Sequence, residues 1–97
     1  MKIAIAQINC LLGDLAGNAA KIAEYAQRAK EQGAAILLTP EMSLCGYPPE
    51  DLLLREGFYL SCEETLHALA QMARGIILIV GHPHKVGKNH YNAASVL

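Results

Sequence analysis

The chain has 97 residues, which is enough for one domain at most. Its formal net charge is −1 and it has no basic patch, so nucleic-acid binding has no electrostatic support. Hydrophobic residues make up 53 % and charged residues 18 % of the chain, which is apolar for its length, because small domains bury a smaller share of their surface. We therefore expect its apolar faces to pack against further chain or another subunit, as in a homo-oligomer.

The N-terminus and the cysteines indicate in which cellular compartment the protein works. Residues 1–7 turn polar too soon for a signal peptide, and no apolar run approaches the roughly 20 residues that span a membrane. The three cysteines, Cys10, Cys45 and Cys62, are odd in number and widely spaced, which argues against a disulfide framework. The sequence thus predicts a protein of the reducing cytoplasm with no membrane partner.

The first half of the chain is predicted as strand, helix, strand. Residues 3–8 form the first strand, and Asn18 is the expected N-cap of the helix, since Gly17 before it is a poor helix former. Gly33 should end that helix. Residues 35–39 are a continuous apolar run, typical of a strand in a sheet with helices on both faces. The inner face of the helix would carry Ala19, Ile22, Ala23, Ala26 and Ala29.

Two further helices are predicted in the second half. Pro48 or Pro49 can open a short helix through Leu54, because proline fits the first helical turn. Ser61 and Glu64 form a capping box, which predicts a longer helix starting there.

Two more strands are expected near the end of the chain. Residues 76–80 predict a third strand ended by Gly81, residues 84–90 a loop, and residues 91–97 a fourth strand. Strand–helix–strand crossovers make the first three strands parallel, and the short last connection allows an antiparallel pair. The expected class is therefore α/β.

Glu41 is the candidate catalytic residue. It follows Pro40 at the C-terminal end of the second strand, where open α/β sheets carry their chemistry, and a carboxylate there can act as a general base. On position alone, a helix-capping or solvent-facing carboxylate is the commoner case. The following loop favours a site, because Gly46 permits an unusual backbone path and two prolines stiffen it.

Two other groups are weaker candidates. Cys45 lies four residues from Glu41, but a reactive thiolate needs a cationic neighbour or a helix N-terminus, and residues 40–54 hold no Lys, Arg or His. We therefore predict that Cys45 is a packed apolar residue. His82 and His84 have the i,i+2 spacing that places two imidazoles on one face of a strand, with His90 nearby. No cysteine or carboxylate lies close to them in sequence, so no metal site is predicted.

Residues 40–53 resemble the first active-site motif of the carbon–nitrogen hydrolase (nitrilase) superfamily. The resemblance extends over nearly the whole chain and includes Ile3 to Gln7, Asn9, Gly13-Asp14, Asn18, His82-Pro83 and Tyr91-Asn92. Within the superfamily, residues 45–53 are most similar to the glutaminase domain of glutamine-dependent NAD synthetases.

The resemblance implies a four-layer α-β-β-α sandwich, of which this chain would supply the N-terminal portion, with four strands and two main helices. It also implies a Cys–Glu–Lys site in which Glu41 is the base and Tyr47 shapes the substrate pocket. The family's Lys and Cys lie further along than Leu97, so residues 1–97 are predicted to be a partial domain, truncated before them and inactive alone.

The implied partner is L-glutamine, hydrolysed through a thioester to release ammonia. The family needs no metal or cofactor at this site. In NAD synthetases a separate domain, with ATP and Mg²⁺, uses the ammonia to amidate deamido-NAD. Two alternatives stay open: part of a free-standing nitrilase-family amidase or carbamoylase, and a non-catalytic fragment or interaction module.

Overall fold

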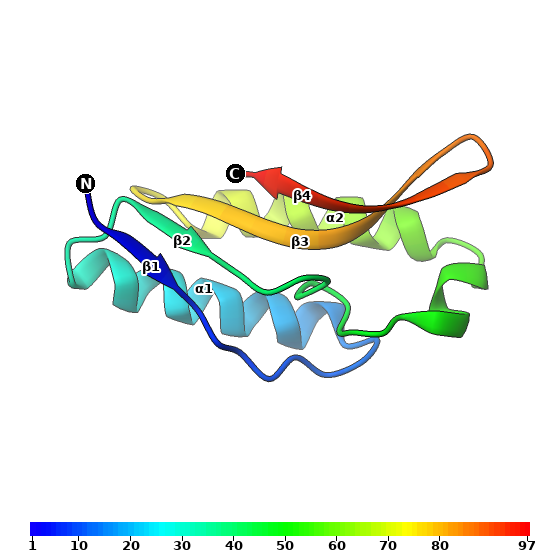
Figure 1. Cartoon of the computed structure of the whole chain (residues 1–97), viewed down its shortest axis with the longest axis horizontal. Helices are drawn as coiled ribbons and strands as arrows, with labels where there is room; N and C mark the ends of the chain where they lie inside the picture. Colours follow the sequence, from blue (N-terminus) through cyan, green and yellow to red (C-terminus); the bar gives the residue numbers. More distant parts are fainter.

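The computed structural model describes every residue of the chain, 1–97, as one four-stranded sheet with helices packed on it (Figure 1). The elements in chain order are β1 (Ile3–Ile5), α1 (Leu15–Glu31), β2 (Ile36–Leu38), the short 3₁₀ helix η1 (Glu50–Leu54), α2 (Phe58–Met72), β3 (Ile77–Val86) and β4 (Asn89–Val96). The strand order is β1-β2-β3-β4. β1, β2 and β3 run parallel and β4 is antiparallel to β3, which confirms the predicted topology.

The helices cover only one face of the sheet. Leu37 and Leu78 pair across β2 and β3 and are buried, because they point toward the helices. The alternate side chains on the other face stay open to solvent. This open face consists of Ile3, Ile5, Leu38, Ile77 and Val96, each more than a third exposed. The expectation of helices on both faces is therefore wrong: the apolar side chains of β2 pack against helices on one face of the sheet only.

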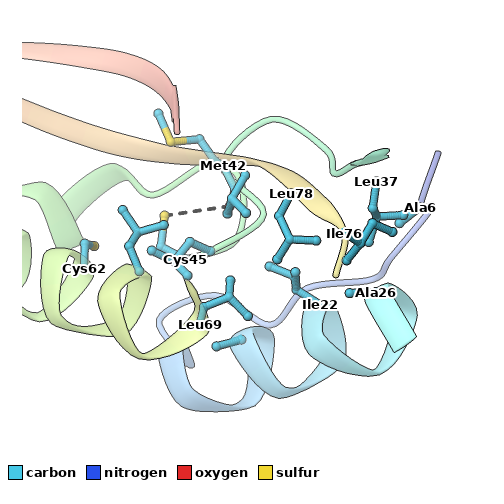
Figure 2. Close-up of a cluster of buried hydrophobic side chains, with 14 of the residues drawn as sticks. Ala6, Ile22, Ala26, Leu37, Met42, Cys45, Cys62, Leu69, Ile76 and Leu78 are labelled. Carbon is cyan, nitrogen blue, oxygen red and sulfur yellow. Dashed lines mark hydrogen bonds between the residues drawn. The ribbon is translucent and has the colours of Figure 1, made fainter. Parts of the chain in front are cut away.

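The hydrophobic core lies between the sheet and the two helices (Figure 2). Ile22 from α1, Leu69 from α2 and Leu78 from β3 are fully buried and meet there. The predicted inner face of α1 is confirmed for Ala19, Ile22, Ala26 and Ala29, which are buried, while Ala23 is only partly buried against the core. None of the helices is both long and apolar enough to cross a membrane.

Helix α1 begins earlier than the sequence predicted. Its N-cap is Asp14, whose Oδ1 accepts a hydrogen bond from the Gly17 N–H at 2.9 Å, so Gly17 is accommodated in the first turn. Asn18 is consequently inside the helix, and its prediction as N-cap is wrong. The helix ends as expected, with Gly33 at φ 84° just beyond it.

Asn18 instead ties three segments together from a fully buried position. Its Oδ1 accepts from the Leu11 N–H at 2.8 Å, and its Nδ2 donates to the carbonyls of Leu11 (2.8 Å) and Leu44 (3.1 Å). Helix α1 thereby holds the loop after β1 against the segment after β2.

Asn18→Ala is expected to destabilise the protein by about 2–3 kcal/mol, because it leaves the buried Leu44 carbonyl and the Leu11 backbone without partners. Urea unfolding midpoints would measure this. Gln27→Ala, on the exposed face of α1, is the matched control and should change stability by less than about 0.5 kcal/mol. An equal effect for the two substitutions would contradict the bridging role of Asn18.

Two further boundaries differ from prediction, and a third element is confirmed. β1 stops at Ile5, because its partner β2 stops at Leu38 opposite it. α2 starts at Phe58 after Gly57, which has φ 77°; Ser61 and Glu64 lie within the helix, so the capping box is wrong. The short helix after the prolines is confirmed, with Pro49 as the N-cap of η1.

The third strand does not end at Gly81 but continues to Val86. Only residues 87 and 88 separate it from β4, so the predicted loop over residues 84–90 is wrong. Gly87 has φ 60° and makes this short reversal possible. The long antiparallel pairing carries β4 back to the C-terminal end of β2, where the candidate site lies.

Candidate functional site

Glu41 lies on a tight turn, residues 40–46, that follows β2. Within the turn, the Ser43 N–H donates to the Pro40 carbonyl at 3.1 Å and the Gly46 N–H to the Met42 carbonyl at 2.8 Å. Met42, next to Glu41, is buried and has φ 53°, a left-handed conformation that is rare for a residue with a side chain. Such strained backbone persists only where the surroundings fix it, and it gathers at functional sites.

Two buried hydroxyls fix the base of this turn against β3. Ser43 Oγ lies 2.7 Å from Thr39 Oγ1, and the Thr39 hydroxyl donates to the Ile79 carbonyl at 3.0 Å. Because that donation uses the only Thr39 hydroxyl proton, Ser43 is the donor in the Ser43–Thr39 bond. The Leu44 N–H adds a bond to the Gly81 carbonyl at 3.1 Å.

Two glycines let backbone segments approach closely around the turn. A Cβ on Gly81 would lie 2.6 Å from the Pro40 carbonyl oxygen and 2.7 Å from the Met42 nitrogen, so the turn occupies the space of a side chain at position 81. Gly46, at φ 85°, packs equally closely on Leu12. The expectation that Gly46 permits a backbone path that other residues resist is confirmed.

The Glu41 side chain is exposed at the C-terminal edge of the sheet, between two hollows. The larger, about 320 Å³, is lined by Glu41 together with residues of β3 and β4, among them Ile79, Gly81 and Asn92. Asn92 Nδ2 donates a 2.5 Å hydrogen bond to Glu41 Oε1. The carboxylate is therefore accessible, and one of its oxygens is held.

Tyr47 lines the smaller hollow, about 180 Å³, on the other side of Glu41. Its side chain is 66 % exposed, so it forms a wall open to solvent. Ile8, Asn9 and Cys10, from the loop after β1, complete this hollow. The structure thus places the two predicted site residues, Glu41 and Tyr47, at one opening.

The cysteines near Glu41 are unsuited to act as nucleophiles. Cys45 is completely buried in the core, where its Sγ faces the Met42 carbonyl and Cys62 lies nearby (Figure 2). Burial raises the pKa of Cys45 to about 11 and that of Cys62 to about 12, and it also raises the pKa of the half-buried Cys10. The complete burial of Cys45 in the core confirms the prediction that it is a packed apolar residue.

The ring nitrogens of His82 and His90 form hydrogen bonds to groups on β3, β4 and α2. Both ring nitrogens of the buried His82 are engaged, Nδ1 with the Pro83 carbonyl at 3.0 Å and Nε2 with Ser95 Oγ at 2.6 Å. His90 Nδ1 lies 2.6 Å from the Tyr59 hydroxyl. No group of three or more His, Cys, Asp or Glu side chains in the chain could hold a metal ion.

Sequence reasoning missed four residues that build the site: Thr39, Ser43, Gly81 and Asn92. The sequence pattern predicts that Gly81 ends a strand, although a glycine inside a strand also marks a close backbone approach. Asn92 is part of the family resemblance, but no local pattern predicts its role. Its pairing with Glu41 joins residues 51 positions apart, which local patterns do not reveal.

β2 is an inner parallel strand, and Glu41, just past its C-terminal end, lines a hollow. This arrangement is typical of the class of open α/β domains, which commonly bind small ligands at the C-terminal edge of the sheet. Within that class, residues 2–97 match the family described as carbon-nitrogen hydrolase. The chain belongs to the carbon–nitrogen hydrolase family.

Individual relatives agree with this assignment. The chain is 46 % identical over its full length to a glutamine-dependent NAD(+) synthetase of Xanthomonas campestris pv. campestris. The solved glutamine-dependent NAD+ synthetase from Acinetobacter baumannii matches 98 % of the chain with a TM-score of 0.88 and 32 % identity. A mutant of the Nesterenkonia amidase, of the nitrilase superfamily, matches 100 % with a TM-score of 0.85 and 30 % identity.

The chain is much shorter than these relatives. It spans 18 % of the length of each of the two NAD synthetases and 38 % of that of the amidase.

Proposed function

We propose that this chain is the N-terminal part of the glutaminase domain of a glutamine-dependent NAD synthetase. The proposal is carried by the 46 % identity over the whole chain to a curated synthetase of that name. In this proposal residues 1–97 are a partial domain, and the nucleophilic cysteine and the oxyanion-stabilising lysine come from chain beyond Leu97. The substrate of the domain is L-glutamine.

Glu41 is the general base in this proposal. Its carboxylate is exposed beside two hollows, so a thiol from another part of the protein can approach it. Glu41 takes the thiol proton as sulfur attacks the glutamine amide carbon, and it returns a proton to the leaving ammonia. It then takes a proton from the water that attacks the thioester carbon, and it returns that proton to the cysteine sulfur as the C–S bond breaks and glutamate is released.

A cysteine nucleophile is consistent with a family member of known structure, since one structure of the Nesterenkonia amidase carries acrylamide added to its active-site cysteine. The chain's own Cys45 and Cys62 are too deeply buried for that role. Tyr47 forms one wall of the substrate pocket, because it lines the same hollow as Glu41.

The ammonia is used elsewhere in the protein. A separate domain would bind ATP, Mg²⁺ and deamido-NAD; within residues 1–97, no group of three or more His, Cys, Asp or Glu side chains gathers to hold a metal ion. The apolar open face would be covered by further chain or by another subunit of a homo-oligomer. We place the protein in the cytoplasm, where its three free cysteines would remain reduced.

A free-standing amidase is the second candidate. The Nesterenkonia amidase matches the whole chain almost as well in structure, with a TM-score of 0.85 against 0.88 for the synthetase. The two candidates share the role of Glu41 and differ in the substrate and in the use of the ammonia.

An assay of the full-length protein tests the proposal. We expect it to form NAD from deamido-NAD and ATP with glutamine as the nitrogen source, while residues 1–97 alone release no ammonia from glutamine. Hydrolysis of small aliphatic amides without NAD formation would favour the amidase. Ammonia release by residues 1–97 above the buffer rate would contradict the need for a cysteine and a lysine from elsewhere.

A further inference from the structure

We infer that Asn92 is a positioning residue for Glu41. Its side-chain amide holds one carboxylate oxygen, so that the other oxygen is presented to the reacting groups. This inference rests on the proposed function, in which Glu41 is the base, and it adds a residue from β4 to the site.

The contact joins two strands that are not neighbours. β3 lies between β2 and β4, and since adjacent strands are about 4.8 Å apart, β2 and β4 are separated by roughly 10 Å. Glu41 follows β2, yet its Oε1 lies 2.5 Å from Asn92 Nδ2. The turn that carries Glu41 closes this distance by packing on Gly81, in the space that a side chain would fill.

The register of β3 and β4 places Asn92 on the correct face. Asn92 pairs with Pro83 and Ala94 with Gly81. Because side chains alternate along a strand, Asn92 and Ala94 share the face of Gly81, away from the helices. Asn92 and Ala94 line the larger hollow together with Glu41, so the hydrogen bond lies at the edge of that space.

The chemistry of an amide suits this task. A carboxylate only accepts hydrogen bonds, so the nitrogen of the Asn92 amide must face Glu41. The amide is neutral and has no basic atom, so it does not compete for the proton that Glu41 takes. The terminal torsion of a glutamate side chain is broad, and a fixed donor narrows it.

The effect should appear in catalysis rather than in folding. Glu41 and Asn92 are both exposed, and one hydrogen bond between exposed groups contributes little to stability, because water competes for both partners. Misplacement of a catalytic group by about 1 Å can cost on the order of a hundredfold in rate. Loss of the donor should therefore lower kcat while folding is retained.

The test uses the full-length protein and three substitutions of Asn92, to Gln, Ala and Asp. We expect kcat for glutamine to fall in that order, because Gln retains a donor, Ala has none, and Asp adds a like charge. Asn92→Ala should lower kcat at least about tenfold and leave KM within about twofold. Synthesis from ammonium salts should be unchanged. Asn89→Ala, at the exposed start of the same strand, is the matched control and should keep full activity.

A crystal structure of the Asn92→Ala variant gives a readout that needs no substrate. We expect the Glu41 carboxylate to lose its single orientation while the turn stays in place. An unchanged Glu41 orientation, or an unchanged kcat, would overturn the inference.

Failure of the proposed function would look different. In that case the wild-type protein would not use glutamine, or Glu41→Gln would retain full turnover. The Asn92 variants would then be compared on whichever amide the protein hydrolyses, and the orientation of Glu41 in the crystal would still decide the inference.

Discussion

Glu41→Gln in the full-length protein is expected to lower glutamine-dependent ammonia release by about 10²–10⁴-fold, the usual cost of losing a general base. Glutamine at this position keeps the size of the side chain but takes no proton at neutral pH. The turn of residues 40–46 should persist, because the Thr39–Ser43 pair and the Gly81 contacts hold it without the carboxylate. NAD synthesis from ammonium salts should be unaffected, since that reaction bypasses glutamine hydrolysis.

The measurement is the initial rate of NAD formation with glutamine and, separately, with ammonium chloride. Glu63→Gln, an exposed glutamate of α2 away from both hollows, is the matched control and should behave as wild type with both nitrogen sources. Near-normal use of glutamine by the Glu41→Gln variant would remove Glu41 from the mechanism.

Gly81→Ala is expected to lower glutamine hydrolysis by about a hundredfold, because it moves the turn that carries Glu41. The new Cβ would meet the Pro40 oxygen at 2.6 Å and the Met42 nitrogen at 2.7 Å. Both are backbone atoms, so no side-chain rotation relieves the clash. Overpacking of this kind also costs about 1–3 kcal/mol of stability.

Gly33→Ala separates the effect on the site from the effect on stability. Gly33 has φ 84°, so alanine there is strained by about 1–2 kcal/mol, but no atom lies within 4 Å of its added Cβ. Urea unfolding should show comparable losses for the two variants, while only Gly81→Ala should lose turnover. Wild-type kcat in Gly81→Ala would show that the turn tolerates displacement.

The directions of the strands could be predicted from the sequence, because they follow from local patterns and one general rule. Apolar runs marked the strands, and helical crossovers between them impose parallel pairing. The inner face of α1 followed from the 3.6-residue period of its alanines. The position of Glu41 after β2 was likewise readable, since Pro40 ends the apolar run just before it.

The starts of the helices and the roles of polar residues were harder to predict from the sequence. Asn18 has the chemistry of an N-cap, but Asp14 lies four residues earlier and takes that role, which frees Asn18 to bridge two loops. Ser61 and Glu64 match a capping box, yet the helix begins at Phe58 and includes them. In both cases the residue type was compatible with a cap, and tertiary packing set the start of the helix elsewhere.

The sequence by itself determined the α/β class, the strand directions and the placement of a carboxylate at the C-terminal end of an inner strand. These properties depend on hydrophobic periodicity and on residues close together in the chain. Only the tertiary structure decided that both helices share one face, that β3 continues past Gly81, and that Asn92 reaches Glu41. The extension of β3 depends on its pairing with β4, and the shared face of the helices depends on how they pack on the sheet. The contact between Asn92 and Glu41 joins residues 51 positions apart and depends on close backbone packing at Gly81.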